Sequence, residues 1–325
     1  MIVLLLVLIN ILALYAILAK DLMQGVLALA GLSLFSTLLF YIFHAPDVAI
    51  TEAAVGTGVS TVIFVWAIRS TDSSAENRKP RKYYRIWENI LSMVIAGIVL
   101  PAVFLMDTPW PVYARNYLEQ YGVQETGAQN LVSSIYLDYR LIDTLGETIV
   151  LLAAISGTIA LMHSSIKKDA MSPADRAGRS PSTSRASGPK SAGRASLRTV
   201  LMQVAAGKLG PVVLLFGMYV MFFGHLSPGG GFQGGVVTAS GIIFLALGSR
   251  EHTDIRLFQP RFLARMEAVA FLMFIMAFLT GMEGTGLFRF LPLETSIILM
   301  NLTIGLKVGS GVALMILTMM RPGEK

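Results

Sequence analysis

The chain has 325 residues, of which 54% are hydrophobic and only 14% charged, with a mean hydropathy of +0.65. Soluble globular proteins have about a quarter of their residues charged, so this composition predicts a membrane protein. The net charge of +6 does not indicate nucleic-acid binding, because the basic residues lie in loops beside apolar spans. Cysteine is absent, which excludes a disulfide, a cysteine-ligated zinc and an iron–sulfur cluster of its own. The four histidines lack metal-ligand spacing, so we expect no metal and no cofactor on this chain.

Nine apolar segments are long enough to cross a bilayer as helices. They cover about residues 2–19, 22–43, 47–68, 90–106, 143–163, 199–223, 231–248, 262–281 and 296–319. The first has no basic residues before it and is followed almost at once by the second, so we interpret it as a helix and not as a signal peptide. The expected fold class is an all-α polytopic membrane protein with about nine transmembrane helices.

The distribution of Lys and Arg tests this count of spans. If the N-terminus lies outside and each span crosses once, 21 of the 26 basic residues fall in cytoplasmic segments and three in outer segments. Cytoplasmic loops of membrane proteins carry such an excess. We therefore expect a multi-pass protein of the cell inner (cytoplasmic) membrane, with its N-terminus outside and its C-terminus in the cytoplasm.

Two basic segments divide the spans into groups of three, two and four. A cytoplasmic joint at 71–88 follows a three-helix unit at 1–70, and a flexible basic linker at 166–198 precedes a four-helix unit at 199–325. Between them lies a two-helix unit at 89–165, whose long outer loop, 107–142, includes a weak helix signal around "VYARNYLEQY". Basic loops also orient helices, so neither joint requires a further role. This 3+2+4 arrangement suggests a fusion of three small membrane units.

The stretch "HAPDVAITEAAVGTGVST" carries the first candidate site residue, Glu52. Pro46 and Asp47 suit the start of a helix, and Glu52 lies about one turn further in. Gly56 and Ser60 follow on the same stripe, where small residues let a neighbouring helix approach closely. We expect Glu52 to face protein and to act as an ion-relay carboxylate. The alternative is a glutamate solvated at the headgroup level.

The stretch "YRLIDTLGETIVLLAAISGTIALM" places Asp143 and Glu147 one turn apart on one helix face, which Ala154 and Gly157 continue. Two nearby carboxylates raise each other's proton affinity, and partial burial raises it further. We therefore expect a site able to hold a proton or a hydrated cation, with Glu147 as its deeper member. Asp143 alone is also explained as an interfacial charge at a helix start.

The stretch "GHLSPGGGFQGG" joins the sixth and seventh spans. Residues 228–231 predict a tight turn. Gly234 and Gly235, which have no side chains, lie at the start of the next helix. No strand precedes this run, so it is not a nucleotide-binding loop, and close backbone packing is its simplest role. His225 is a candidate proton relay, and a satisfied structural histidine is an equal alternative.

Lys307 lies near the middle of the last span, in "NLTIGLKVGSGVALMIL". Thr303, Ser310 and Gly311 place it on a small, polar helix face. A charged lysine at mid-bilayer costs roughly 2.5–3.5 kcal/mol on insertion scales, so we expect a hydrated path or a carboxylate partner. Lys208, nearer the inner face, is a further candidate for the ion path, and its alternative is a side chain that extends to the interface. Glu267 lies similarly near the inner end of its span.

Three stretches resemble known membrane subunits. "DLMQGVLALAGLSLFSTLLFYIFHAPDVAITEAAVGTGVSTVIFVWAI" resembles the three-helix unit that ends the large Mrp antiporter subunit and stands alone as the D subunit of membrane-bound hydrogenases. "YRLIDTLGETIVLLAAISGTIALM" resembles the two-helix hydrogenase E subunit. "PVVLLFGMYVMFFGHLSPGGGFQGGVVTASGIIFLALG", together with the stretch around Lys307, resembles the MnhB/MrpB subunit, which is the hydrogenase F subunit. Of these, "GHLSPGGGFQGG" is the most specific motif.

This resemblance implies a subunit of a multisubunit Na⁺/H⁺-translocating complex, in which Glu52, Glu147 and Lys307 match charged intramembrane positions. The antiporter pattern resembles "PDLALTQ…VE", whereas here Glu52 occupies the Gln position and Gly56 the later Glu position. "TEAAVG" is closer to the hydrogenase-type unit, which favours a complex I-like respiratory assembly. In that case the partners include membrane subunits and redox subunits with iron–sulfur clusters or a NiFe site.

Three other interpretations stay open. The chain is alternatively a subunit of a stand-alone Mrp cation/proton antiporter, or a structural membrane subunit with no transport role. A self-sufficient transporter would usually show inverted repeats, and none is evident. The chain shows no catalytic or redox centre, so any enzyme activity belongs to the whole complex.

Overall fold

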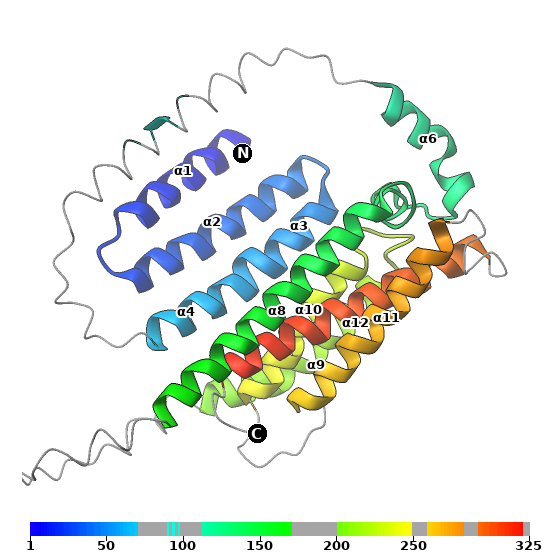
Figure 1. Cartoon of the computed structure of the whole chain (residues 1–325). Helices are drawn as coiled ribbons and strands as arrows, with labels where there is room; N and C mark the ends of the chain where they lie inside the picture. Colours follow the sequence, from blue (N-terminus) through cyan, green and yellow to red (C-terminus); the bar gives the residue numbers. More distant parts are fainter. Residues whose placement is uncertain are drawn as a thin grey trace, which may run out of the picture.

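The computed structural model describes residues 1–70, 90, 93–94, 97, 112–170, 200–248, 259–282 and 292–320, and their regular elements are all helices (Figure 1). Six helices in these ranges are long and apolar enough to cross a membrane: Leu22–Ile42, Pro46–Ile68, Leu141–Met162, Val204–Phe222, Pro260–Leu279 and Leu293–Met320. Two shorter apolar helices are Ile2–Leu18 and Gly231–Ala246. The chain is therefore a multi-pass membrane protein built from helices.

These eight helices coincide with eight of the nine predicted spans. The predicted span 90–106 and the joint 71–88 lie almost entirely outside the described residues, as does most of the linker 166–198. The total of nine spans and the 3+2+4 arrangement thus stay predictions. One boundary differs, because α8 (Leu141–Ala170) extends past the predicted linker start at residue 166. The segment "IKKDA" contains no Gly or Pro, so nothing in it ends the helix.

The first 70 residues form a row of helices, α1 (Ile2–Leu18), α2 (Leu22–Ile42) and a third composite helix, which lie side by side in Figure 1. The Asp21 side chain caps α2 by accepting a hydrogen bond from the Met23 N–H. The composite helix consists of α3 (Pro46–Glu52), the π-helical turn η1 (Ala53–Ser60) and α4 (Thr61–Ser70). Pro46 stands at its first turn, as predicted.

Helix α12 (Leu293–Met320) is the centre of the second part of the molecule, and most of its residues are buried. Around it pack α8, α9 (Val200–Phe222), α10 (Gly231–Gly248) and α11 (Pro260–Met282). Glycines bring α10 and α12 close together, since a Cβ on Gly235 would lie only 2.7 Å from the Gly305 carbonyl oxygen. This contact fits the close backbone packing expected for the glycine-rich motif.

One end of this bundle carries α6 (Val112–Thr126), α7 (Leu131–Ser134) and the π-helical turn η3 (Ile135–Tyr139), which lead into α8 (Figure 1). Helix α6 covers the "VYARNYLEQY" stretch in which a short helix was expected. Helix α6 is polar on average, and it is not among the apolar helices long enough to span a membrane. We refer to this end, which also holds the turn at residues 223–230, as the turn end.

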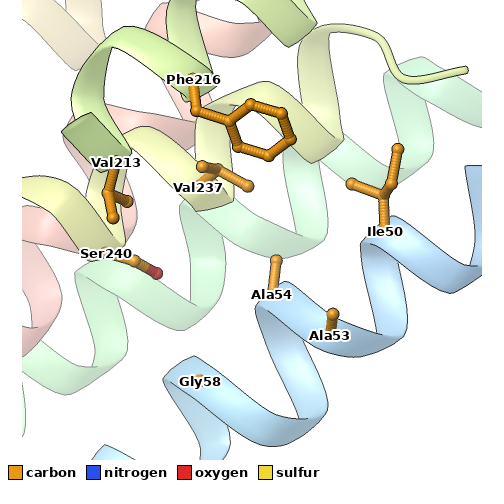
Figure 2. Close-up of a pocket in the computed structure, with 8 residues that line it drawn as sticks. All are labelled: Ile50, Ala53, Ala54, Gly58, Val213, Phe216, Val237 and Ser240. Atoms are coloured by element: carbon orange, nitrogen blue, oxygen red, sulfur yellow. The ribbon is translucent and has the colours of Figure 1, made fainter. Parts of the chain in front are cut away.

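The row and the bundle meet where η1 packs on α10. A cavity of about 290 Å³ lies between them, as Figure 2 shows. It is lined by Ile50, Ala53, Ala54, Gly58, Val213, Phe216, Val237 and Ser240. The Ser240 hydroxyl donates to the Val236 carbonyl, so the cavity presents an essentially apolar wall.

Candidate functional site

Lys307 is fully buried at 0% exposure in the middle of α12. Its ammonium Nζ lies 2.5 Å from the Thr148 carbonyl oxygen on α8 and 5.7 Å from the ring centroid of Phe271 on α11. The carbonyl accepts a charge-assisted hydrogen bond, and the ring face attracts the cation. An ammonium has three N–H donors, so this arrangement leaves two that make no hydrogen bond to the described residues. Such a group can exchange a proton with a neighbour.

The polar face predicted around Lys307 exists, but its hydroxyls make no hydrogen bond to the Lys307 ammonium. Thr303 and Ser310 are both buried, and each hydroxyl donates to a carbonyl of its own helix, Thr303 to Met300 and Ser310 to Leu306. Lys307 therefore reaches across to α8 instead. Its direct partner is a backbone carbonyl, whereas the sequence predicted a carboxylate or a hydrated path.

Glu147 lies on a different side of α8 from the lysine contact. Glu147 and Asp143 are both exposed, and Gly146 and Gly157 have open space where a Cβ would stand. Asp143 forms an ion pair with Arg140 at the start of the helix. The two carboxylates thus share a face, as their spacing predicted, but the described part of this chain does not cover it. Lys307 contacts α8 at the Thr148 carbonyl, and Glu147 is the residue directly before Thr148 on that helix. The two charged side chains nevertheless lie on different sides of α8.

Glu52 is half-buried at the junction of α3 and η1. Its Oε1 accepts a hydrogen bond from the Ser33 hydroxyl of α2, at 2.6 Å. A Cβ on Gly56 would collide with Ser33 and lie 2.8 Å from Glu52 Oε1, so the glycine makes room for this contact. Glu52 therefore faces a neighbouring helix, as its small-residue stripe predicted. The π-helical turn directly after it was not predicted, and such turns often occur at functional sites.

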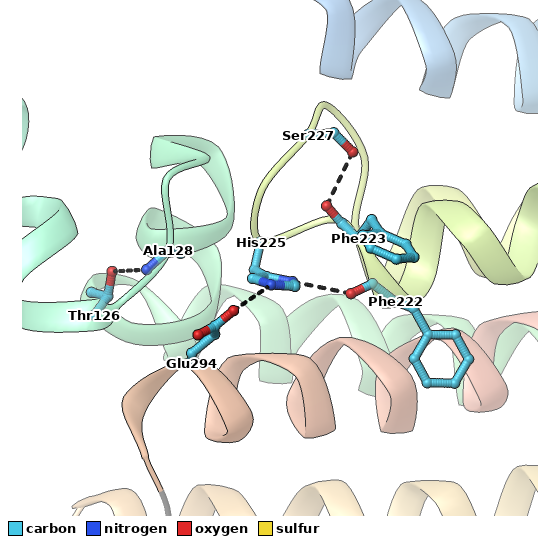
Figure 3. Close-up of polar contacts among 7 residues, drawn as sticks. All are labelled: Thr126, Ala128, Phe222, Phe223, His225, Ser227 and Glu294. Carbon is cyan, nitrogen blue, oxygen red and sulfur yellow. Dashed lines mark hydrogen bonds and ion pairs between the residues drawn. The ribbon is translucent and has the colours of Figure 1, made fainter.

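His225 is buried at the turn end, at 3% exposure (Figure 3). Its Nε2 lies 3.1 Å from Glu294 Oε1 and its Nδ1 lies 3.0 Å from the Phe222 carbonyl oxygen. Both ring nitrogens thus have partners, one of them an exposed carboxylate at the start of α12. This geometry is compatible with a proton relay at a surface and equally with a structural histidine. Lys208, by contrast, is exposed on α9, as expected for a side chain that reaches the interface.

Sequence reasoning missed a polar junction at the turn end. Asp47 is 8% exposed, and its Oδ1 accepts hydrogen bonds from the Gly229 N–H at 2.8 Å and from Asn130 Nδ2 at 3.1 Å. Asn130 Nδ2 also lies 3.1 Å from the Gly224 carbonyl oxygen and 3.0 Å from that of Ser227. Three distant parts of the sequence therefore meet here. The sequence carried one signal for this junction, which is the presence of both a helix-start aspartate and a glycine-rich turn.

A second set of contacts extends this junction to α12. The Tyr136 hydroxyl of η3 donates to Asn301 Oδ1 at 2.7 Å, and the Gly231 N–H donates to the same oxygen at 2.7 Å. Burial raises the pKa of Tyr136, so its phenol stays protonated and remains a donor. Asn301 is fully buried and lies between one and two turns from Lys307 on the same helix. The junction thus fixes the turn-end half of the helix that carries the lysine.

The six predicted site residues do not form one cluster. Among them, the described structure shows no hydrogen bond or ion pair that joins Glu52, Glu147 and Lys307 to one another. Glu52 lies in the row, Lys307 in the bundle core and Glu147 on an uncovered face. A connected path would therefore need additional groups between them.

Two family models match the chain. The MbhD model, which describes the D subunit of MBH, covers residues 7–73, and the model for a domain related to the MnhB subunit of Na⁺/H⁺ antiporter covers residues 201–314. The two matched parts are thus similar to MBH- and Mrp-type membrane subunits. The matches fall on the first and last units predicted from the sequence, which agrees with the resemblance described there. The exact unit boundaries stay predictions.

Individual relatives of this chain are larger proteins. It is 27% identical over 235 residues to a protein of Rhizobium meliloti named as the probable A/B subunit of a K(+)/H(+) antiporter, and the match covers 68% of this chain and 23% of that protein. It is 32% identical over 131 residues to a protein of Staphylococcus saprophyticus named as a putative mnhA2 antiporter subunit, and this match covers 39% of this chain and 16% of that one. The chain thus spans less than a quarter of the length of these relatives.

The fold of this chain also occurs in a solved structure, the Mrp complex from Dietzia sp. DQ12-45-1b. The superposition covers 99% of this chain and 35% of the other chain, with a TM-score of 0.70 and 19% sequence identity. At that identity the likeness shows the fold. It includes the middle part of the chain, which neither family model covers.

Proposed function

We propose that this chain is a membrane subunit of a multisubunit Na⁺/H⁺-translocating complex and contributes part of its ion path. The observation that carries this proposal is Lys307, a fully buried ammonium in a membrane-spanning helix, held by a single backbone carbonyl and an aromatic ring. Ionisable groups inside the membrane are costly and usually serve transport. A purely structural contact at this place could be made by an uncharged side chain at lower cost.

In this proposal Glu52 and Glu147 belong to the same path as Lys307, with Asp143, His225 and Lys208 nearer the ends of the helices. Glu147 lies on a face that the described part of this chain leaves open. A membrane carboxylate on an open face requires a partner, so another subunit would complete the path there. This requirement supports an assembly of several subunits over transport by the single chain.

The kind of assembly is the finer part of the proposal. We favour a complex I-like respiratory assembly of the membrane-bound hydrogenase type, because the stretch "TEAAVG" around Glu52 resembles that type of unit more than the antiporter pattern. The relatives named as antiporter subunits support the alternative, a stand-alone Mrp antiporter. In either case we expect the redox centres, if any, on partner subunits, and the C-terminus of this chain in the cytoplasm.

Gentle purification of the tagged chain from its native membranes, followed by mass spectrometry, tests this proposal. Recovery with antiporter-type membrane subunits is expected, and recovery of iron–sulfur or NiFe subunits as well would select the respiratory type. Antiporter-type subunits alone would select the Mrp alternative. If the chain came from mild preparations without any other membrane subunit, the multisubunit proposal would be wrong.

A further inference from the structure

Glu267 is a buried carboxylate to which the proposed path gives no role. It lies on α11 inside the apolar span Pro260–Leu279 and is 6% exposed. Its Oε1 has no hydrogen-bond partner among the described residues. Burying a carboxylate without a hydrogen bond or a counter-charge is expensive, so a group of opposite charge is needed nearby.

The nearest candidate cation is on the neighbouring helix. Phe271, one turn from Glu267 on α11, holds its ring 5.7 Å from Lys307 Nζ. Gly311 is one turn from Lys307 on α12, and a Cβ placed there would lie 3.3 Å from Glu267 Cγ. Glu267 and Lys307 therefore line the same seam between α11 and α12.

The two charged side chains come from the two helices that form this seam. They are not in direct contact, because the described residues contain no ion pair of 4.0 Å or less between them. Glu147 is the other acidic group near this level, but it lies on the exposed side of α8. Glu267 is thus the carboxylate that shares the interior with Lys307, and the glycine at 311 leaves the space for its side chain.

We propose that Glu267 and Lys307 form a buried proton-exchange pair. In the exchange an N–H bond of the Lys307 ammonium breaks and an O–H bond forms on Glu267, so ammonium and carboxylate become amine and carboxylic acid. The net charge of the pair is zero before and after, so neither state leaves an uncompensated charge in the core. In this proposal bridging water carries the proton across the gap. The use of this pair in transport rests on the proposed function, whereas the charge pairing itself does not.

A double-mutant cycle in the intact, purified complex tests the pair. The variants are Glu267→Gln, Lys307→Met and the two combined, and the readouts are the midpoint of thermal unfolding and ion transport in vesicles. Each single variant leaves one buried charge alone and should lower the midpoint by about 5 °C, whereas the double variant should regain at least about half of the summed loss. Arg265→Met, an exposed cation on the same helix, should leave the midpoint within about 1 °C.

The transport measurement distinguishes failure of the Glu267–Lys307 pair from failure of the proposed function. Glu267→Gln should lower transport by about tenfold or more, as loss of a proton acceptor predicts. Additive losses of stability would overturn the pair while leaving the ion-path proposal standing. Coupled stability with normal transport in Glu267→Gln would overturn the proton exchange. If both single variants fail to assemble, assembly of the double variant supports the pair and its failure overturns it.

Discussion

The Asp47 carboxylate accepts a hydrogen bond from the backbone N–H of Gly229, with 2.8 Å between Oδ1 and N, although 182 residues separate them in sequence. Asn130 donates to the same oxygen. One side chain from the MbhD-type part thus holds the glycine turn of the MnhB-related part, with a residue from the middle of the chain between them. The contact explains how these two parts of the chain are fixed to each other at one end.

Replacing Asp47 with alanine should loosen this junction. The substitution leaves the Gly229 N–H without its acceptor and removes a charge-assisted contact to Asn130, which together correspond to about 3 kcal/mol. We expect the midpoint of thermal unfolding of the purified complex to fall by about 5 °C or more. Glu119→Gln is the matched control, because Glu119 forms only an exposed ion pair with Arg115 and should cost under about 0.5 kcal/mol. Equal midpoints for the two variants would contradict this account.

A second prediction concerns Gly230 in the glycine turn. Its φ of +149° lies in a region that residues with a side chain rarely adopt, and an added Cβ would collide with Tyr136. Gly230→Ala should therefore destabilise the complex by about 2–3 kcal/mol. Gly207→Ala provides the contrast, since that position is helical with open space around it, and alanine there should be neutral or stabilising by up to about 1 kcal/mol. A harmless Gly230→Ala variant would show that the turn is not held as described.

Glu52 can be neutralised while its hydrogen bond is kept. In Glu52→Gln the side-chain oxygen can still accept from the Ser33 hydroxyl, so the variant should assemble normally. Because the amide cannot bind a proton, we expect transport by the complex to fall by about tenfold or more. Ser33→Ala removes the donor but keeps the carboxylate, so it should retain most of the transport. Normal transport in Glu52→Gln would remove this residue from the path.

Helix α6 should respond to acid. Glu125 accepts hydrogen bonds from the hydroxyls of Tyr139 and Tyr117, the latter at 2.8 Å, and these donors lower the pKa of its carboxyl. A group whose pKa is lowered by folding stabilises the fold above its ordinary pKa, and the contribution is lost as the pH falls through the lowered value. The protection of the α6 amides against hydrogen exchange, taken relative to the intrinsic exchange rate at each pH, should therefore fall below about pH 4. This loss of protection should be weaker in Glu125→Gln, and an identical pH profile in that variant would contradict the assignment.

Much of the helical architecture could be predicted from the sequence because membrane spans are defined by length and apolar composition alone. The burial of Lys307 was also predictable, since its helical neighbours at 303, 310 and 311 are all small or polar. Likewise, the spacing of the glycines in "GHLSPGGGFQGG" already indicated backbones in close contact. In each of these cases the signal lies within one helix or one turn.

The rest depends on contacts between distant segments. Periodicity places Asp143 and Glu147 on one face, but it does not say which neighbour covers that face, and in this chain none of the described residues does. The acceptor for Lys307 is a backbone carbonyl, which no residue type reveals. Asn130 lies in a polar loop, where its role as a link between Asp47 and the glycine turn has no local signal. The π-helical turn after Glu52 packs against α2 and α10 and has no simple sequence pattern.

The most direct test of the central claim is ion transport by membrane vesicles that contain the intact complex with Lys307→Met. Methionine fills a similar volume without charge, so assembly can be checked first by recovery of the partner subunits. If Lys307 carries a proton along the path, assembled variant complex should lose at least about nine-tenths of its coupled Na⁺/H⁺ movement. Transport at the unsubstituted rate by fully assembled variant complex would show that Lys307 is structural and that the path lies elsewhere.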